Sequence, residues 1–195
     1  MVAVQHELGG RDRILTAARS LFTNHGFHQT SVAELASAAQ VSVGQIYRLF
    51  KGKEDIIAAI VQADSEAREA EIAVLQRNLN AGTMTIEQTF EQLLLFAVDG
   101  HDEALSFDIL AEAFRNDAVG EMIGAMCLRL RQYIRDFACA ANPNLSGEAL
   151  DGAEEMILAC IFGLGHRSLS RPKLSATQTA RRSGQMIVAA LKAIH

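Results

Sequence analysis

Residues 43–53 bring together side chains that can recognise a DNA duplex through hydrogen bonds and charge. Gly44, Gln45, Tyr47 and Arg48 fall on one side of a short predicted helix, which is followed by two lysines. Amide and guanidinium groups can read base edges in a major groove, and lysines bind phosphates. A surface of this kind needs a rigid scaffold that holds the helix outward.

Two capping-box patterns start the helices of this scaffold. In a capping box, a Ser or Thr hydroxyl caps the backbone N–H three residues on, and a Glu or Gln at that position caps the first residue in return. Ser31 with Glu34 and Ser42 with Gln45 both fit. They predict two short helices joined by a three-residue turn, the second over residues 43–50.

A third helix is predicted upstream, where apolar residues recur at helical spacing and Gly26 follows as a helix stop. The apolar residues are Ile14, Ala17, Ala18, Leu21 and Phe22. Such a helix can cover the inner side of the pair. From the residues alone, the pair is either a DNA-binding helix-turn-helix or a solvated helix pair in an ordinary bundle.

Residues 11–60 resemble the DNA-binding domain of the TetR/AcrR family of bacterial transcriptional regulators. The resemblance rests on HGF at the end of the first helix and on QTSVAELASAAQVSVGQIYRLFKGKEDII after it. It spans roughly a quarter of the chain, and the remainder matches only in its succession of helices.

The resemblance implies that helix N-termini and basic side chains hold phosphates, while the third helix faces the groove. Gln45 is the best candidate base reader because its amide can pair with adenine, and Arg48 could read guanine or take a phosphate. Val43 departs from the Lys, Pro or Thr of many family members. The implied DNA contacts are Thr30, Ser31, Ser42, Val43, Gly44, Gln45, Tyr47, Arg48, Lys51 and Lys53.

Charge supports a local DNA-binding module. Residues 1–53 hold six Lys or Arg and three acids, a net +3, so the chain's −5 leaves −8 for residues 54–195. A +3 module would hold DNA weakly, and a symmetric dimer would double its contacts. Its two recognition helices would then lie about 34–36 Å apart on a palindromic site.

The chain is predicted to be all-α, with about nine helices. Its residues are 49% apolar with only two prolines, and they show no sustained strand alternation. Capping boxes recur at Thr85 with Gln88 and at Ser175 with Gln178. We expect a three-helix bundle with the helix-turn-helix over 1–53, and a larger helical ligand-binding and dimerisation domain over 54–195.

In the family, the central helices enclose a pocket for a small inducer. Flexible Met and flat aromatic side chains suit such a pocket, although the same residues could simply fill the core. Asp108 and Glu112 could select a cationic ligand if they face inward, or could lie on a solvated edge. The predicted lining residues are Phe90, Phe107, Asp108, Phe114, Met122, Met126 and Tyr133.

The last two predicted helices are expected to form the dimer interface. In the family this pair meets its symmetry mate as a four-helix bundle. The alternative is that their apolar stripes are satisfied within one subunit. The predicted interface residues are Met156, Ala159, Cys160, Gly163, Leu164, Gly184, Ile187, Val188 and Leu191.

Other functions find little support in the sequence. The longest apolar run, of about ten residues, is too short to span a membrane, and no signal peptide opens the chain, so we expect a cytoplasmic protein. The cysteines lack C-x-x-C pairs and are expected to be buried thiols, with redox sensing as a minor alternative. The six His show no metal-ligand spacing. We expect no metal, no cofactor and no enzymatic activity.

These expectations combine into one mechanism. A homodimeric regulator, most simply a repressor, would bind a palindromic double-stranded DNA operator. A small hydrophobic ligand would bind better when the heads are spread, and would thereby lower the population able to span successive grooves. The alternative is a helical DNA-binding adaptor that recruits a protein partner without a small-molecule switch.

Overall fold

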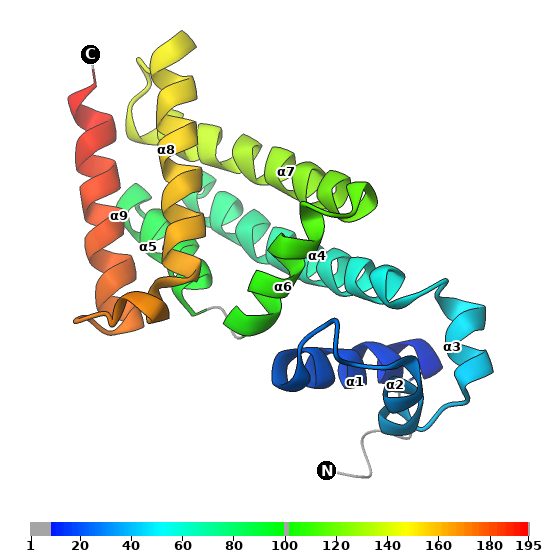
Figure 1. Cartoon of the computed structure of the whole chain (residues 1–195). Coiled ribbons are helices and arrows are strands. Elements are labelled where there is room, and N and C mark those ends of the chain that lie inside the picture. Colours follow the sequence, from blue (N-terminus) through cyan, green and yellow to red (C-terminus); the bar gives the residue numbers. More distant parts are fainter. Residues whose placement is uncertain (1–8, 100–101, 195) are drawn as a thin grey trace. The chain divides into compact units, whose positions relative to one another are not determined.

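The computed structural model describes residues 9–99 and 102–194, which form nine α-helices, one short 3-10 helix and no strand (Figure 1). The all-α prediction is confirmed over these ranges. The α-helices are α1 (Gly10–His25), α2 (Val32–Ala39), α3 (Val43–Leu49), α4 (Lys53–Asn80), α5 (Ile86–Val98), α6 (Glu103–Ala113), α7 (Asp117–Ala141), α8 (Gly147–Gly165) and α9 (Ala176–Ala193).

The chain divides into two compact units. The head unit comprises residues 1–66 and 102–125, and the body unit comprises residues 67–101 and 126–195. The head unit therefore contains the predicted DNA-binding segment 1–53, and adds the first part of α4, the whole of α6 and the start of α7. Helices α4 and α7 each begin in the head unit and continue into the body unit.

The head unit has its own apolar core. Phe22 and Phe27 are buried and pack edge to face, with ring centroids 5.2 Å apart. Leu105 of α6 and Val119 of α7 join the same cluster. Helix α6 is thus part of the packing that keeps α1, α2 and α3 together.

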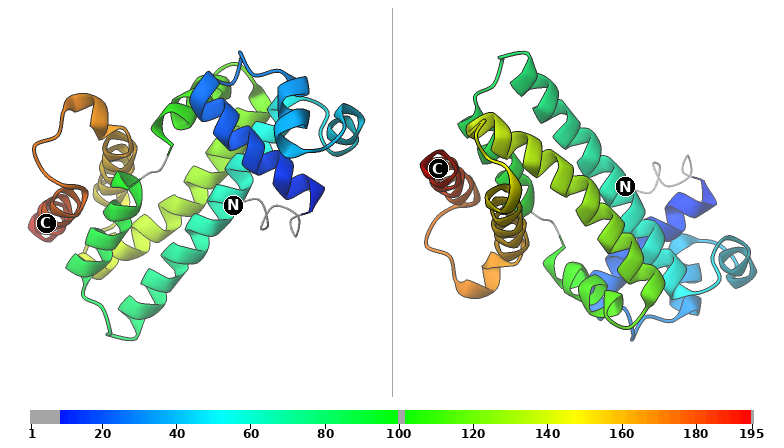
Figure 2. Two further views of the ribbon diagram at one scale, coloured as in Figure 1. Left: turned by 90° about the horizontal axis from the view of Figure 1, so that it is seen from below. Right: turned by 90° about the horizontal axis from the view of Figure 1, so that it is seen from above.

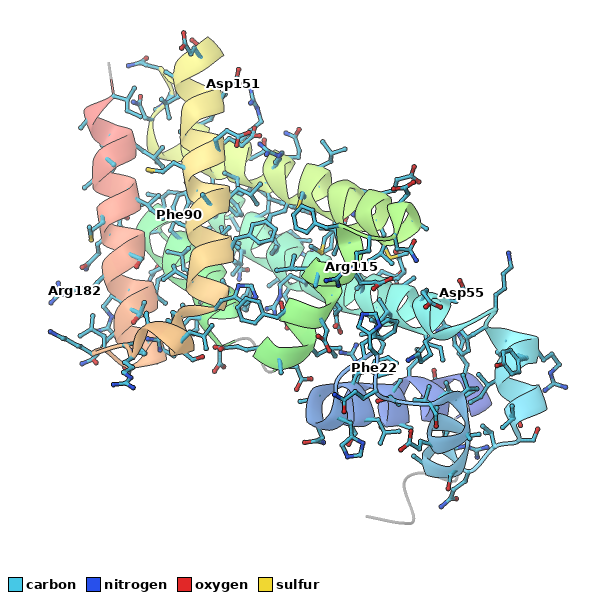
Figure 3. All side chains as sticks on the ribbon, in the orientation of Figure 1. Phe22, Asp55, Phe90, Arg115, Asp151 and Arg182 are labelled. Carbon is cyan, nitrogen blue, oxygen red and sulfur yellow. The ribbon has the colours of Figure 1, made fainter. Side chains whose placement is uncertain are left out.

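The core of the body unit is built around α5. Phe90 is fully buried and packs edge to face on Phe137 of α7, 6.2 Å between centroids (Figure 3). Helix α9 approaches α5 so closely that a Cβ on Gly184 would lie 3.0 Å from the backbone nitrogen of Glu91. Figures 1 and 2 show α8 and α9 running side by side in opposite directions.

Two further features bear on the sequence predictions. No helix in the described ranges is long and apolar enough to cross a bilayer. Cys127, Cys139 and Cys160 are free thiols that are half-buried rather than buried as expected. Burial raises the pKa of the Cys127 thiol, although the charge of Arg131 opposes this.

A buried carboxylate joins α7 to α8 in the body unit. Glu154 is 7% exposed and accepts hydrogen bonds from Arg131 and Arg135. Burial alone would raise the pKa of Glu154, but the hydrogen bonds and charges of the two arginines outweigh it and hold the pKa below its ordinary value of 4.5. The ionised form of Glu154 therefore stabilises the fold.

The lowered pKa predicts how this stabilisation depends on pH. Above the unfolded-state pKa the contribution is complete, and it is lost as the pH falls through the lower folded-state value. We expect Glu154→Gln to lower the free energy of unfolding by about 2 kcal/mol at pH 7, because charged hydrogen bonds are lost. Urea unfolding at pH 7 and pH 3 measures this difference, which should shrink in acid.

Glu155→Gln is the matched control, because Glu155 pairs with Arg131 while its side chain is 69% exposed. Exposed pairs contribute about 0.5 kcal/mol or less. A Glu154→Gln cost that is equal at both pH values would contradict the assignment.

Candidate nucleic-acid interface

The turn between α2 and α3 is fixed at both ends. Ser31 and Glu34 form the predicted capping box, with the Glu34 carboxylate 2.7 Å from the Ser31 nitrogen. This backbone hydrogen bond, together with one from the Ser31 hydroxyl, lowers the pKa of Glu34. Gln40 takes the left-handed conformation at φ 53°, and the Val41 N–H donates to the Ala36 carbonyl at 3.0 Å. This closure ends α2 and sets the direction of α3.

Helix α3 presents two different faces. Ile46 and the following Phe50 are buried in the head core at 1% and 5% exposure. Tyr47 is 58% exposed, and Val43 is 41% exposed. Gly44 and Arg48 are exposed as well. Leu49 is 42% exposed.

The capping box predicted for α3 forms only in part. The Ser42 hydroxyl accepts from the Gln45 N–H at 3.1 Å, but the Gln45 amide lies against Gly10 of α1 instead of returning to Ser42. A completed box would hold the amide on its own backbone. The Gln45 side chain is half-buried, and it packs against neighbouring residues of the head unit instead of bonding to the Ser42 backbone.

Gly44 is not required by the fold itself. A Cβ at this position would meet nothing closer than the Ser42 hydroxyl at 3.9 Å, and the backbone is ordinary helix. Its lack of a side chain therefore affects only what approaches α3 from outside.

Two predicted phosphate contacts are used within the head unit. Thr30 is 1% exposed, and its hydroxyl donates to the Gly26 carbonyl at 2.9 Å. The Lys53 ammonium donates to the carbonyls of Phe27 at 2.7 Å and Thr30 at 2.8 Å. Both side chains were expected to contact phosphate directly, but here they donate to backbone carbonyls of residues 26–30, which lie between α1 and α2.

Lys51 differs from Lys53 in its surroundings. Its side chain is exposed, while its backbone N–H donates to the carboxylate of Asp55 at 2.8 Å and so fixes the start of α4. Ser31 and Ser42 are also exposed. The exposed part of the predicted interface consequently comprises Ser31, Ser42, Val43, Gly44, Tyr47, Arg48 and Lys51, with Gln45 at its edge.

The predicted ligand-lining residues are divided between the two units. Phe107, Asp108, Phe114 and Met122 belong to the head unit, and the other three belong to the body unit. Phe114 is 93% exposed, Phe107 is 42% exposed and Phe90 lies fully within the body core. Tyr133 packs on that core, and Met122 and Met126 are half-buried.

A cavity of about 240 Å³ opens in the body unit between α4 and α5. The Arg68 guanidinium lies 4.7 Å from the ring centroid of Phe96 and pairs with Glu71 at 2.7 Å. Leu95 and Asp99 complete the lining, so none of the predicted ligand residues belongs to it.

The predicted interface residues separate into two groups. Met156, Ala159 and Gly163 are exposed on α8, with Cys160 and Leu164 half-buried beside them. On α9, Gly184, Ile187, Val188 and Leu191 are buried in the body core instead. These four residues are buried within the subunit because α9 packs on α5. The exposed side of α9 carries Arg182, Met186 and Ala189.

Comparison with known proteins agrees with the head geometry. Residues 14–60 match the sequence model of bacterial regulatory proteins, tetR family. The HTH-type transcriptional regulator UidR of Escherichia coli (strain K12) is 29% identical over 125 residues, covering 64% of this chain and 62% of that protein. The match thus spans less than two thirds of this relative's length.

Solved structures share the fold of the whole chain. Salmonella enterica GusR is 24% identical with a TM-score of 0.64, covering 92% of this chain and 95% of that chain. The transcriptional regulator FadR from Bacillus subtilis, in complex with stearoyl-CoA, is 19% identical with a TM-score of 0.68, covering 94% and 99%. The helix-turn-helix lies within residues 14–60, the segment of the chain that is similar to the tetR family of bacterial regulatory proteins.

Proposed function

We propose that this protein is a homodimeric transcriptional regulator that binds double-stranded DNA through α3. The main support is that α3 has one buried and one exposed face. Ile46 is buried in the head core, while Gly44, Tyr47 and Arg48 face outward. A short helix held in this way is what a major groove accepts. Gln45 and Arg48 are the base-reading candidates, and Tyr47 and Lys51 hold phosphates.

The dimer would use the exposed side of α8 together with that of α9. Met156 is 45% exposed and Met186 is 72% exposed, next to the small residues Ala159, Gly163 and Ala189. A second copy of the chain would bury these side chains in a twofold interface. Two α3 helices on one scaffold would then suit a palindromic operator.

Similarity to the tetR family and to FadR supports control of DNA binding by a small apolar ligand. FadR binds stearoyl-CoA, which supports an acyl ligand for this chain as well. The ligand would bind better to a conformation with displaced heads and so act as an inducer of a repressed gene. A thermal shift with stearoyl-CoA but not with free CoA would support an acyl ligand, and a panel without any stabilising compound would favour the adaptor alternative.

The function predicts salt-dependent binding to DNA beside the protein's own coding sequence. A dimer with six or more phosphate contacts should lose about a thousandfold in affinity between 50 and 200 mM salt. Fluorescence anisotropy of a labelled duplex measures this. Absence of any salt-dependent binding to that region would contradict the proposal.

A further inference from the structure

The Gln45 side chain lies against the start of α1 within the head unit. Its neighbours on the outward face of α3, namely Gly44, Tyr47 and Arg48, are exposed, whereas Gln45 is half-buried. A Cβ added to Gly10 would lie 2.3 Å from Gln45 Nε2 and 3.6 Å from Gln45 Cδ. The Gln45 amide therefore occupies the space that a side chain at position 10 would need. We call this the retracted position of Gln45.

The overlap with a Cβ at position 10 is confined to the end of the Gln45 side chain. A separation of 2.3 Å is far below any that real Cβ atoms show, whereas 3.6 Å to Cδ is ordinary van der Waals contact. Away from the adjacent backbone of α1, no other described atom lies within 4 Å of that Cβ. Rotation of the Gln45 side chain alone would thus relieve the overlap, and the backbones of α1 and α3 could stay in place.

The retracted position is held weakly. The backbone N–H of Gln45 donates to the Ser42 hydroxyl at 3.1 Å, but its side-chain amide makes no hydrogen bond within residues 9–99 and 102–194. Contact and partial burial are what hold the amide, and individual van der Waals contacts are small. The outward position of the side chain is therefore only slightly less favourable than the retracted one.

Retraction has a consequence for the reading of a base. A glutamine amide pairs with adenine through both its N–H and its carbonyl oxygen, so the amide must first rotate away from Gly10. When only a fraction of the molecules hold the competent conformation, the apparent affinity is reduced by that fraction. Duplexes whose binding does not use the Gln45 amide are not affected in this way.

We propose that Gly10 is a specificity-determining residue, which accommodates the retracted Gln45 amide and thereby lowers the preference for adenine at the base pair that Gln45 reads. This inference rests on the proposed function and adds a control of its sequence selectivity. A methyl group at position 10 excludes the retracted position, so that Gln45 points outward before DNA binds. Gly10 exerts this effect without contacting the DNA.

The full-length Gly10→Ala variant tests this inference. The wild-type protein first selects its operator from random duplexes, and the base pair read by Gln45 is the one at which Gln45→Ala loses its preference. We expect Gly10→Ala to bind the duplex with adenine at that position about threefold more tightly than the wild type does. Its affinity for duplexes with another base there should be unchanged.

Gly9→Ala is the matched control, because it makes the same change one residue earlier at the start of α1. A Cβ on Gly9 would meet only Asp12 Oδ2, at an ordinary 3.5 Å. We expect wild-type affinities for every duplex in this variant. In the Gln45→Ala background, Gly10→Ala should likewise change no affinity, whereas a gain that persists there would show an effect on α1 itself and would overturn the inference.

Nuclear Overhauser contacts give a second readout without DNA. In the free wild-type protein the side-chain amide protons of Gln45 should contact the Hα protons of Gly10, and in Gly10→Ala this contact to residue 10 should be lost. An amide that is distant from Gly10 in the wild type would overturn the inference. So would weaker binding of Gly10→Ala to the adenine duplex, since the contact would then position Gln45 for reading.

The same experiments separate this inference from the proposed function. If Gly10→Ala binds every duplex like the wild type while Gln45→Ala relaxes sequence choice, the inference alone fails. A wild-type protein that binds no duplex overturns the proposed function and the inference with it.

Discussion

The variant with both Arg48 and Lys51 changed to alanine is expected to bind all DNA duplexes at least a hundredfold more weakly than the wild type. Both side chains are exposed beside the outward face of α3. A dimer would lose up to four phosphate or base contacts, and the slope of log affinity against log salt should become shallower by roughly 2 to 4. Anisotropy titrations over 50–300 mM salt measure both quantities.

The matched control changes Arg77 and Lys173, two exposed cations of the body unit, to alanine. The net charge is altered equally, so a general electrostatic effect would weaken both double variants alike. Equal losses of DNA affinity in the two double variants would show that α3 does not contact the DNA. Melting temperatures should stay near the wild-type value in both, because none of the four side chains is buried.

A second large effect is expected for Phe90→Ala, which should lower the free energy of unfolding by about 3–5 kcal/mol. Phe90 is fully buried against Phe137, and removal of its ring leaves a cavity in the body core. For a chain of this size, the loss should lower Tm by roughly 10 °C. Calorimetry or urea unfolding measures it.

Phe114→Ala is the same substitution at a residue that is 93% exposed, and should cost no more than about 0.5 kcal/mol. Both phenylalanines were candidates for a ligand pocket from the sequence. A small cost at Phe90, together with stabilisation of the wild type by an acyl ligand, would indicate that Phe90 lines a pocket after all.

Local signals in the sequence predicted the helices well. The capping box of Ser31 with Glu34 predicted the start of α2, and Gly26 predicted the end of α1. Such signals act within one or two turns, where hydrogen bonds and side-chain direction are decided by near neighbours.

Tertiary contacts were harder to predict, because helical spacing shows which residues share a face and not what that face meets. Gly184 does allow close approach, but to α5 of the same subunit rather than to a partner. Asp108 and Glu112 were predicted either to face a ligand or to lie on a solvated edge, yet they face residues 27 and 28 between α1 and α2. The signal that could have revealed this is their helical spacing with Leu105 and Ile109, which form the buried side of α6.

Lys53 shows a further limit. A lysine at the start of α4 is equally suited to a phosphate or to backbone carbonyls, and its sequence neighbours do not distinguish the two. In the structure, the Lys53 ammonium donates hydrogen bonds to the backbone carbonyls of Phe27, His28 and Thr30. Lys51, two residues earlier, keeps the exposed position that phosphate binding requires.

The most direct test of the whole account is hydroxyl-radical footprinting of the full-length protein on the DNA beside its own coding sequence. A twofold dimer should protect two half-sites related by a dyad, with centres about 34–36 Å apart or a multiple of that distance. The Arg48 and Lys51 double-alanine variant should leave no footprint at the same concentration. A single unsymmetrical footprint, or protection that survives the double substitution, would contradict the twofold pair of α3 helices on which the account depends.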